Sequence, residues 1–168
     1  MSRLNTRNLV LMALLITLQI IFTRFLSIQT PIVRIDLNFL PLSMCAALFG
    51  PIWGGIAAAA ADFIGVTIFP VGGAYFPGFT LSTFLMGFIY GSFLYDREKS
   101  IARISIAVLL VMLICSITLD SIWVMITTGK TLAAFLPVRL IRCVLMFPIQ
   151  IALIRLSWNA VCSRLNIF

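Results

Sequence analysis

Six long apolar runs fill most of this 168-residue chain, and no polar stretch is long enough for a soluble domain. The mean hydropathy is +1.15, and 62% of the residues are hydrophobic. About 20 apolar residues suffice for a helix to cross a bilayer, whereas a membrane β-barrel would show short alternating segments. We therefore expect an all-α integral membrane protein, a single domain over 1–168 with about six transmembrane helices, near 8–26, 37–50, 51–69, 78–95, 104–127 and 138–158.

Positive charge predicts the orientation of these helices. The chain has a net charge of +7, and one group of cations falls at the helix ends that share a side if six helices cross. The positive-inside rule makes that side, with both termini, cytoplasmic in a multi-pass protein of the cell (plasma) membrane. No basic stripe is interleaved with exposed aromatics, so we expect no nucleic-acid partner. The inner cations are Arg3, Arg7, Arg97, Lys99, Arg103 and Arg164.

A second group of charges lies inside or at the edge of the apolar runs, toward the outer face. A charge at membrane depth costs a few kcal/mol and usually marks a functional site. Charges on one side only predict a pocket open to that side rather than a pore. Arg139 and Arg142, spaced i, i+3, share a helix face, and Arg142 and Asp120 fall at similar depth. The group comprises Arg24, Asp62, Asp120, Arg139 and Arg142, with Arg34 and Lys130 in outer loops.

The segment 69–78 is rich in glycine, proline and aromatic residues. Aromatics at this depth commonly form an interfacial belt, which is the simpler interpretation of each one. A belt explains the paired glycines and two prolines poorly, and aromatic rings can also clamp a flat conjugated ligand. Tyr75, Phe76, Phe79 and Trp123 could sandwich such a ring. Gly72, Gly73 and the polar Thr80 and Ser82 are further predicted binding residues.

Several kinds of chemistry are excluded by the residues themselves. The chain has no histidine, which removes Ser-His and Cys-His catalysis and histidine metal sites. Gly129-Lys130-Thr131 resembles the end of a phosphate loop, but Val124 stands where that motif needs glycine. We expect no enzyme activity, no ATP site and no cofactor. The carboxylates Asp62 and Asp120 leave a proton-coupled transporter open as an alternative.

The motifs at 61–65, 69–82 and 136–139 resemble those of the S components of energy-coupling factor vitamin transporters, most closely the folate-specific branch. The resemblance covers essentially the whole chain. It implies an S-component fold that binds folate from outside and docks onto a membrane T component with two ATPases. Docking in that family uses small residues on the first helix, and the matching positions here are Ala13 and Thr17.

The resemblance and the residues together predict high-affinity capture of folate. An S component for another heteroaromatic vitamin is the alternative within the class, although a ring without an acidic tail leaves the outer arginines unexplained. The predicted substrate-binding residues are Arg24, Arg34, Asp62, Gly72, Gly73, Tyr75, Phe76, Phe79, Thr80, Ser82, Trp123, Arg139 and Arg142.

Overall fold

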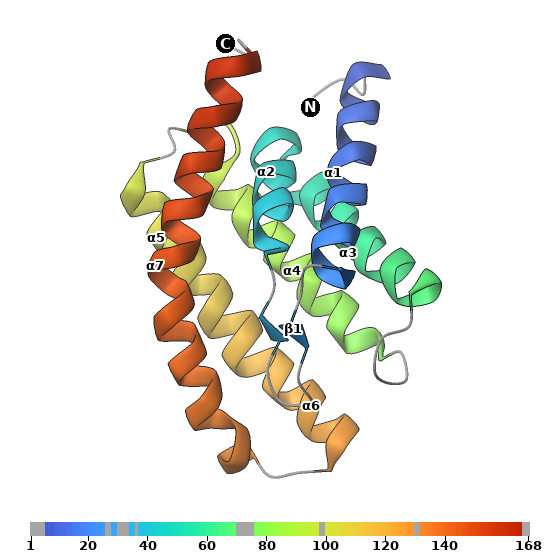
Figure 1. Cartoon of the computed structure of the whole chain (residues 1–168), viewed down its shortest axis with the longest axis vertical. Helices are drawn as coiled ribbons and strands as arrows, with labels where there is room; N and C mark the ends of the chain where they lie inside the picture. The colour runs from blue at the N-terminus through green and yellow to red at the C-terminus, as the bar shows by residue number, and fades with distance from the viewer. Residues whose placement is uncertain are drawn as a thin grey trace.

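The computed structural model describes residues 6–25, 28–29, 34–35, 37–69, 76–97, 100–129 and 132–165. Within these ranges the chain is a bundle of helices with a small hairpin, and both termini lie at the same end (Figure 1). The elements are α1 (Thr6–Arg24), β1 (Ile28–Gln29), β2 (Arg34–Ile35), α2 (Phe39–Phe49), α3 (Pro51–Ile68), α4 (Pro77–Leu94), α5 (Ile101–Leu110), the π-helix η1 (Val111–Leu119), α6 (Asp120–Thr128) and α7 (Leu132–Leu165).

Among the described residues, five helical segments are long and apolar enough to cross a membrane. One of them, Ile101–Thr127, runs without a break through α5, η1 and α6. The remaining predicted span, 37–50, corresponds to the short helix α2, whose 11 residues are too few to cross a bilayer alone. The prediction of an all-helical, multi-pass membrane protein is therefore confirmed.

The last helix is longer than the predicted 138–158, because it begins at Leu132 and includes both Pro137 and Pro148. We expected the first of these prolines to precede the helix. Proline is tolerated inside transmembrane helices when neighbouring groups satisfy the freed carbonyl. The two prolines therefore interrupt the hydrogen-bond ladder of α7 without ending the helix.

The segment between α1 and α2 contains a short antiparallel hairpin. Ile28 pairs with Ile35, and Gln29 pairs with Arg34. The hairpin lies in the half of the molecule away from the termini (Figure 1). It brings the backbone of Arg34 to that half.

Close contact between α3 and α4 is made possible by glycine. A Cβ atom on Gly87 would lie 2.6 Å from the carbonyl oxygen of Gly54 and 2.9 Å from the Cα of Gly55. A Cβ on Gly91 would overlap Pro51 in the same way. Small residues allow helix backbones to approach closely in lipid, where van der Waals packing is the main attraction. These glycines therefore allow α3 and α4 to pack closely in the part of each helix nearer the termini.

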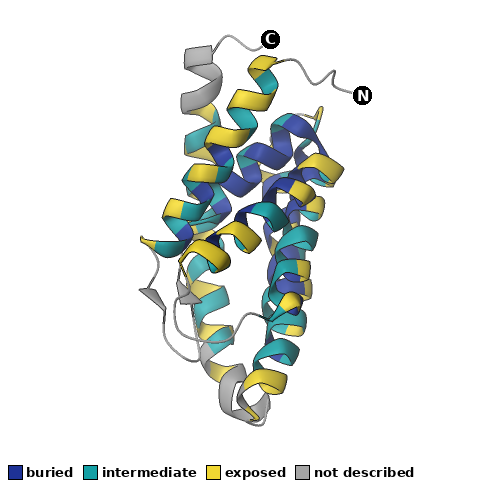
Figure 2. Cartoon of the chain, turned by 90° about the vertical axis from the view of Figure 1, so that its right-hand side faces the viewer, coloured by how far each residue is buried: buried dark blue, intermediate teal, exposed yellow. Residues whose placement is uncertain are grey.

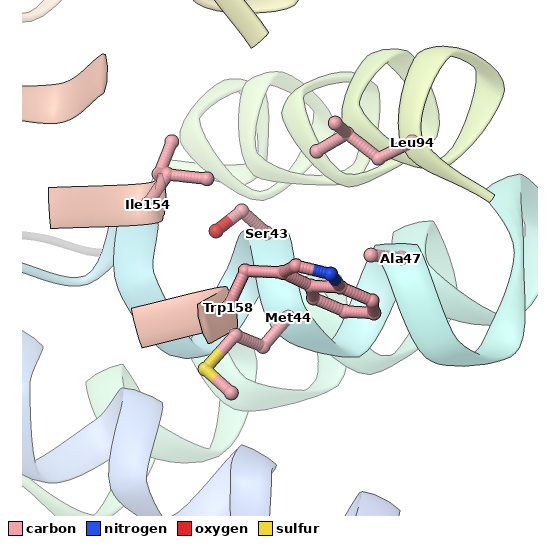
Figure 3. Close-up of a pocket in the computed structure, with 6 residues that line it drawn as sticks. All are labelled: Ser43, Met44, Ala47, Leu94, Ile154 and Trp158. Carbon is pink, nitrogen blue, oxygen red and sulfur yellow. The ribbon is translucent and has the colours of Figure 1, made fainter. Parts of the chain in front are cut away.

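The most completely buried side chains gather at the end that carries the termini (Figure 2). Tyr90 and Leu94 of α4 pack there with Ile104 and Val108 of α5. At the same end Trp158 lies against Ser43 and Ala47 of α2 in a small apolar hollow (Figure 3). The remaining lining residues of this hollow are Met44, Leu94 and Ile154.

The opposite half carries fewer fully buried side chains, as Figure 2 shows. The start of α4, the end of α3 and α6 lie in this half. They bear the predicted site residues Asp62, Phe79, Thr80, Ser82 and Trp123. The hollow at Leu94 is 12 residues, or about 18 Å of helix, from Ser82. It is therefore separate from the charged and aromatic cluster.

Candidate functional site

A hydrogen bond between α3 and α4 positions the side chain of Asp62, in the half away from the termini. Thr80 Oγ1 donates to Asp62 Oδ2 at 2.9 Å, and both side chains are partly buried. A carboxylate oxygen can accept more than one hydrogen bond, so Thr80 orients Asp62 without exhausting its capacity. The predicted residues Asp62 and Thr80 thus form one unit.

An aromatic group lies beside this unit, where α6 meets the first turns of α4. The ring of Phe76 is 5.4 Å from Trp123 and 6.2 Å from Phe79, measured between centroids. Trp123 Nε1 donates to Ser82 Oγ at 3.0 Å, and Ser82 is almost completely buried. This bond satisfies the indole N–H at membrane depth and fixes the ring plane. All four residues were predicted from the sequence.

Gly78 belongs to the site but was not predicted. A Cβ at this position would lie 2.6 Å from the Trp123 ring and 2.5 Å from the Phe76 ring. The residue is helical, so its lack of a side chain serves space rather than an unusual dihedral. The glycine next to Pro77 was visible in the sequence, but only the fold shows which rings need its room.

Arg24, at the end of α1, lies against the same face of α3 as Asp62. A Cβ on Gly65 would be 3.1 Å from Arg24 Nε. Gly65 follows Asp62 by three residues, which places the two positions on one face of the helix. Glycine at position 65 therefore leaves room for the guanidinium beside the site.

Arg139 of α7 is bound to the segment where η1 becomes α6. Its Nη1 donates to the carbonyl oxygen of Ser116 at 2.8 Å and to Ser121 Oγ at 3.1 Å. Asp120 and Arg142 both interact electrostatically with Arg139. From their similar depth, Arg142 was the expected partner of Asp120; the structure shows an electrostatic interaction of Asp120 with Arg139. Neither serine was predicted, because the partners depend on the packing of α7.

Four predicted residues cannot be placed by their side chains. Gly72, Gly73 and Tyr75 lie outside the described residues, and Arg34 is described only through its backbone in β2. The structure therefore brings together Asp62 with Thr80, and Phe76 and Phe79 with Trp123 and Ser82. In the described part of the chain, no cluster of three or more acidic, cysteine or histidine side chains could hold a metal ion.

The predicted docking residues lie elsewhere, on an open face of α1. Ala13 and Thr17 are exposed, and Thr17 Oγ1 donates to the Ala13 carbonyl at 2.9 Å. This bond within the helix hides the polar hydroxyl, so the face remains compatible with lipid or with another helix.

This fold is that of a known class of membrane transport protein. The model of a family described as the ECF-type riboflavin transporter, S component, matches residues 3–158. The chain belongs to this S-component family. The prediction of a transport subunit, rather than an enzyme, is thereby confirmed.

Individual members of the family that resemble this chain are folate transporters. Over 167 residues the chain is 44% identical to the folate transporter FolT of Clostridium novyi (strain NT), covering 99% of this chain and 95% of that protein. Over 157 residues it is 36% identical to the folate transporter FolT of Leuconostoc mesenteroides subsp. mesenteroides, covering 90% and 84%. A crystal structure of FolT bound with folic acid has a TM-score of 0.88 and 40% identity, covering 93% of this chain and 95% of that one.

Replacing Gly78 tests the packing of the aromatic group. We expect Gly78→Ala to displace Trp123 or Phe76 and to destabilise the protein by about 1–3 kcal/mol, as overpacking does. Near-ultraviolet circular dichroism and thermal unfolding in detergent measure the two effects. Thr83→Ala is the control, since that hydroxyl bonds only the Phe79 carbonyl of its own helix. An unchanged aromatic signal in Gly78→Ala would show that the rings do not depend on this space.

Proposed function

We propose that this protein captures folate from outside the cell and delivers it inward, as the S component of an ATP-driven transporter. The observation that carries the proposal is the pairing of an oriented carboxylate, Asp62, with an aromatic group in the half away from the termini. Folate combines a flat heteroaromatic ring with an acidic tail, so it needs both kinds of contact.

Asp62 matches the hydrogen-bonding edge of the pterin ring. This edge presents an exocyclic amine and a ring N–H side by side, and a carboxylate can accept from both. Thr80 holds one oxygen of Asp62. The carboxylate is thereby turned before ligand arrives, which lowers the cost of ordering on binding.

The aromatic group supplies the flat contact. Phe76 and Trp123 are tilted by 49° to one another, and Trp123 is fixed by its bond to Ser82. A conjugated ring gains from offset or edge contact with such side chains as well as from burial. Phe79 adds a third ring, and the segment 70–75 completes the predicted set with Gly72, Gly73 and Tyr75.

The carboxylates of the folate tail would be bound by positively charged side chains. Arginine forks bind carboxylates in a bidentate manner. Arg24 lies next to the Asp62 face of α3, and the backbone of Arg34 belongs to the hairpin in the same half of the molecule. We assign the tail to Arg24, Arg34 and Arg142, since Nη1 of Arg139 is already bound to protein acceptors.

Riboflavin is the second candidate, because the matching family bears its name. The dione edge of its flavin ring presents two carbonyl oxygens on either side of one N–H. A carboxylate at Asp62 would oppose those carbonyls, whereas it complements the donor edge of a pterin. The tail of riboflavin is uncharged and leaves the outer arginines without a ligand. Both points favour folate, in line with the relatives that carry the name FolT.

The remaining parts of the mechanism follow from this assignment. The positive-inside rule supports cytoplasmic termini, and with that orientation the Asp62 half faces outward. A T component and two ATPases supply the energy, with the exposed Ala13 and Thr17 face of α1 as the docking surface. Small residues there would let a partner helix approach closely.

Titration of the purified protein tests ligand capture directly. We expect folate to bind one-to-one without ATP or partners, with a Kd below about 1 µM, equivalent to about 8 kcal/mol. Isothermal calorimetry in detergent measures this, with riboflavin titrated into a second sample. Tight binding of riboflavin and none of folate would replace the proposed substrate, and binding of neither by folded protein would remove both.

Asp62→Asn tests recognition of the ring. The asparagine keeps an oxygen for Thr80 but presents an amide N–H toward the donor edge, so we expect about 10- to 100-fold weaker binding. The loss should be equal for folate and for a pterin fragment without the tail. Asp96→Asn makes the same change at an exposed turn beyond α4 and should leave both affinities unaltered. Unaltered affinity in Asp62→Asn, with folding verified, would exclude this contact.

Thr17→Leu tests the docking face. A bulky side chain should obstruct close helix packing, so we expect uptake in cells containing the T component and ATPases to fall about tenfold or more while folate binding persists. Thr67→Leu is the matched control, because Thr67 is also exposed and also bonds the carbonyl four residues earlier. Normal uptake by Thr17→Leu would move the docking surface elsewhere. Uptake without any partner would instead support a proton-coupled transporter.

A further inference from the structure

The π-helix η1 interrupts a spanning segment immediately before the site. Two bonds show its wide spacing: Thr118 Oγ1 donates to the carbonyl of Leu113 at 2.9 Å, and the Asp120 N–H donates to the carbonyl of Cys115. Both reach back five residues, where an α-helix would reach four. A π segment inside a helix is uncommon and frequently occurs at functional sites.

The return to α-helix affects one carbonyl in particular. The N–H of Asp120 uses Cys115, whereas α-helical spacing from Ser121 onward would use Ile117. With that spacing the carbonyl of Ser116, which falls between them, would receive no N–H from the backbone ladder. A carbonyl without a donor at membrane depth costs free energy.

Arg139 supplies the donor that this junction needs. Its Nη1 reaches the Ser116 carbonyl at 2.8 Å and the Ser121 hydroxyl at 3.1 Å, so one nitrogen joins the last turn of η1 to the first turn of α6. Its Nε is buried as well, which places the side chain inside the protein. A charged donor makes such a bond stronger than a neutral one.

The junction determines where the following side chains point. Each additional residue in a turn rotates all later positions by about 100° around the helix axis. Trp123 is two residues beyond Ser121, and from there it contacts Phe76 and bonds Ser82 of α4. If η1 became regular α-helix, Trp123 would turn away from α4.

We propose that Arg139 is a positioning residue that holds the π-to-α junction and thereby directs Trp123 into the binding site. It acts through the Ser116 carbonyl and the Ser121 hydroxyl, not through the acidic tail of the ligand. The part of this inference that concerns affinity rests on the proposed binding of folate. The part that concerns Trp123 does not, because it holds for the protein without ligand.

Fluorescence of the ligand-free protein tests the positioning directly. In a background with Trp53→Phe and Trp158→Phe, Trp123 is the remaining tryptophan. We expect Arg139→Ala to shift its emission maximum in the absence of any ligand. Arg155→Ala removes an exposed arginine from the same helix and should not shift it. Unchanged emission in folded Arg139→Ala would overturn the proposal whether or not folate binds.

Ser121→Ala keeps the experiment decisive if Arg139→Ala does not fold. This variant retains the full charge of Arg139 and removes one of its two acceptors. Positioning predicts a shifted Trp123 emission, and about tenfold weaker binding of both folate and a tail-free pterin. A direct role in the tail predicts normal emission, with no loss for the pterin. That second result would return Arg139 to the ligand.

Discussion

The hydrocarbon core of a membrane contains no water to satisfy a polar side chain, so each such group must find its partner within the protein. Among the described residues, contacts between helices that meet this requirement in the half away from the termini include Thr80 with Asp62, Trp123 with Ser82, and Arg139 with Ser121. They join α3 to α4, α4 to α6, and α6 to α7. The helices around the site are thus linked in series by their own polar groups, and the geometry of the site depends on these links.

The two halves of the molecule are held together by different means. Near the termini, glycine contacts and a compact core that includes Tyr90 and Ile104 hold the helices together. In the other half, a few directional bonds hold the helices, and burial is less complete (Figure 2). A bonded site can be completed by a ligand that adds its own donors and acceptors, whereas a close-packed core has no room for one. We therefore expect a ligand to be accommodated in the half away from the termini without repacking of the other half.

Much of this arrangement could be predicted from the sequence. The length of the apolar runs predicted the spanning helices. The free-energy cost of a charge inside the membrane pointed to Asp62 and Arg139 as functional residues, although their partners were not predicted. The π-helix could not be predicted, because hydrophobic periodicity in an apolar spanning segment does not distinguish a π turn from an α turn. The role of Gly78 could not be predicted for a related reason. The rings that need its space belong to Trp123 of another helix and to Phe76, which precedes α4.

The first helix links the two activities proposed for this protein. Arg24, at the end of this helix, lies against Gly65 on the Asp62 face of α3. Thr17 lies seven residues, or about 10 Å, before Arg24 in the same helix. A rigid helix transmits a displacement of one end to the other, so a ligand that moves Arg24 also moves the docking face. Because coupling is reciprocal, a partner that binds one position of α1 more tightly alters the affinity for ligand by the same factor. In the proposed function, capture of the ligand and docking of the partner would therefore be coupled through a single helix.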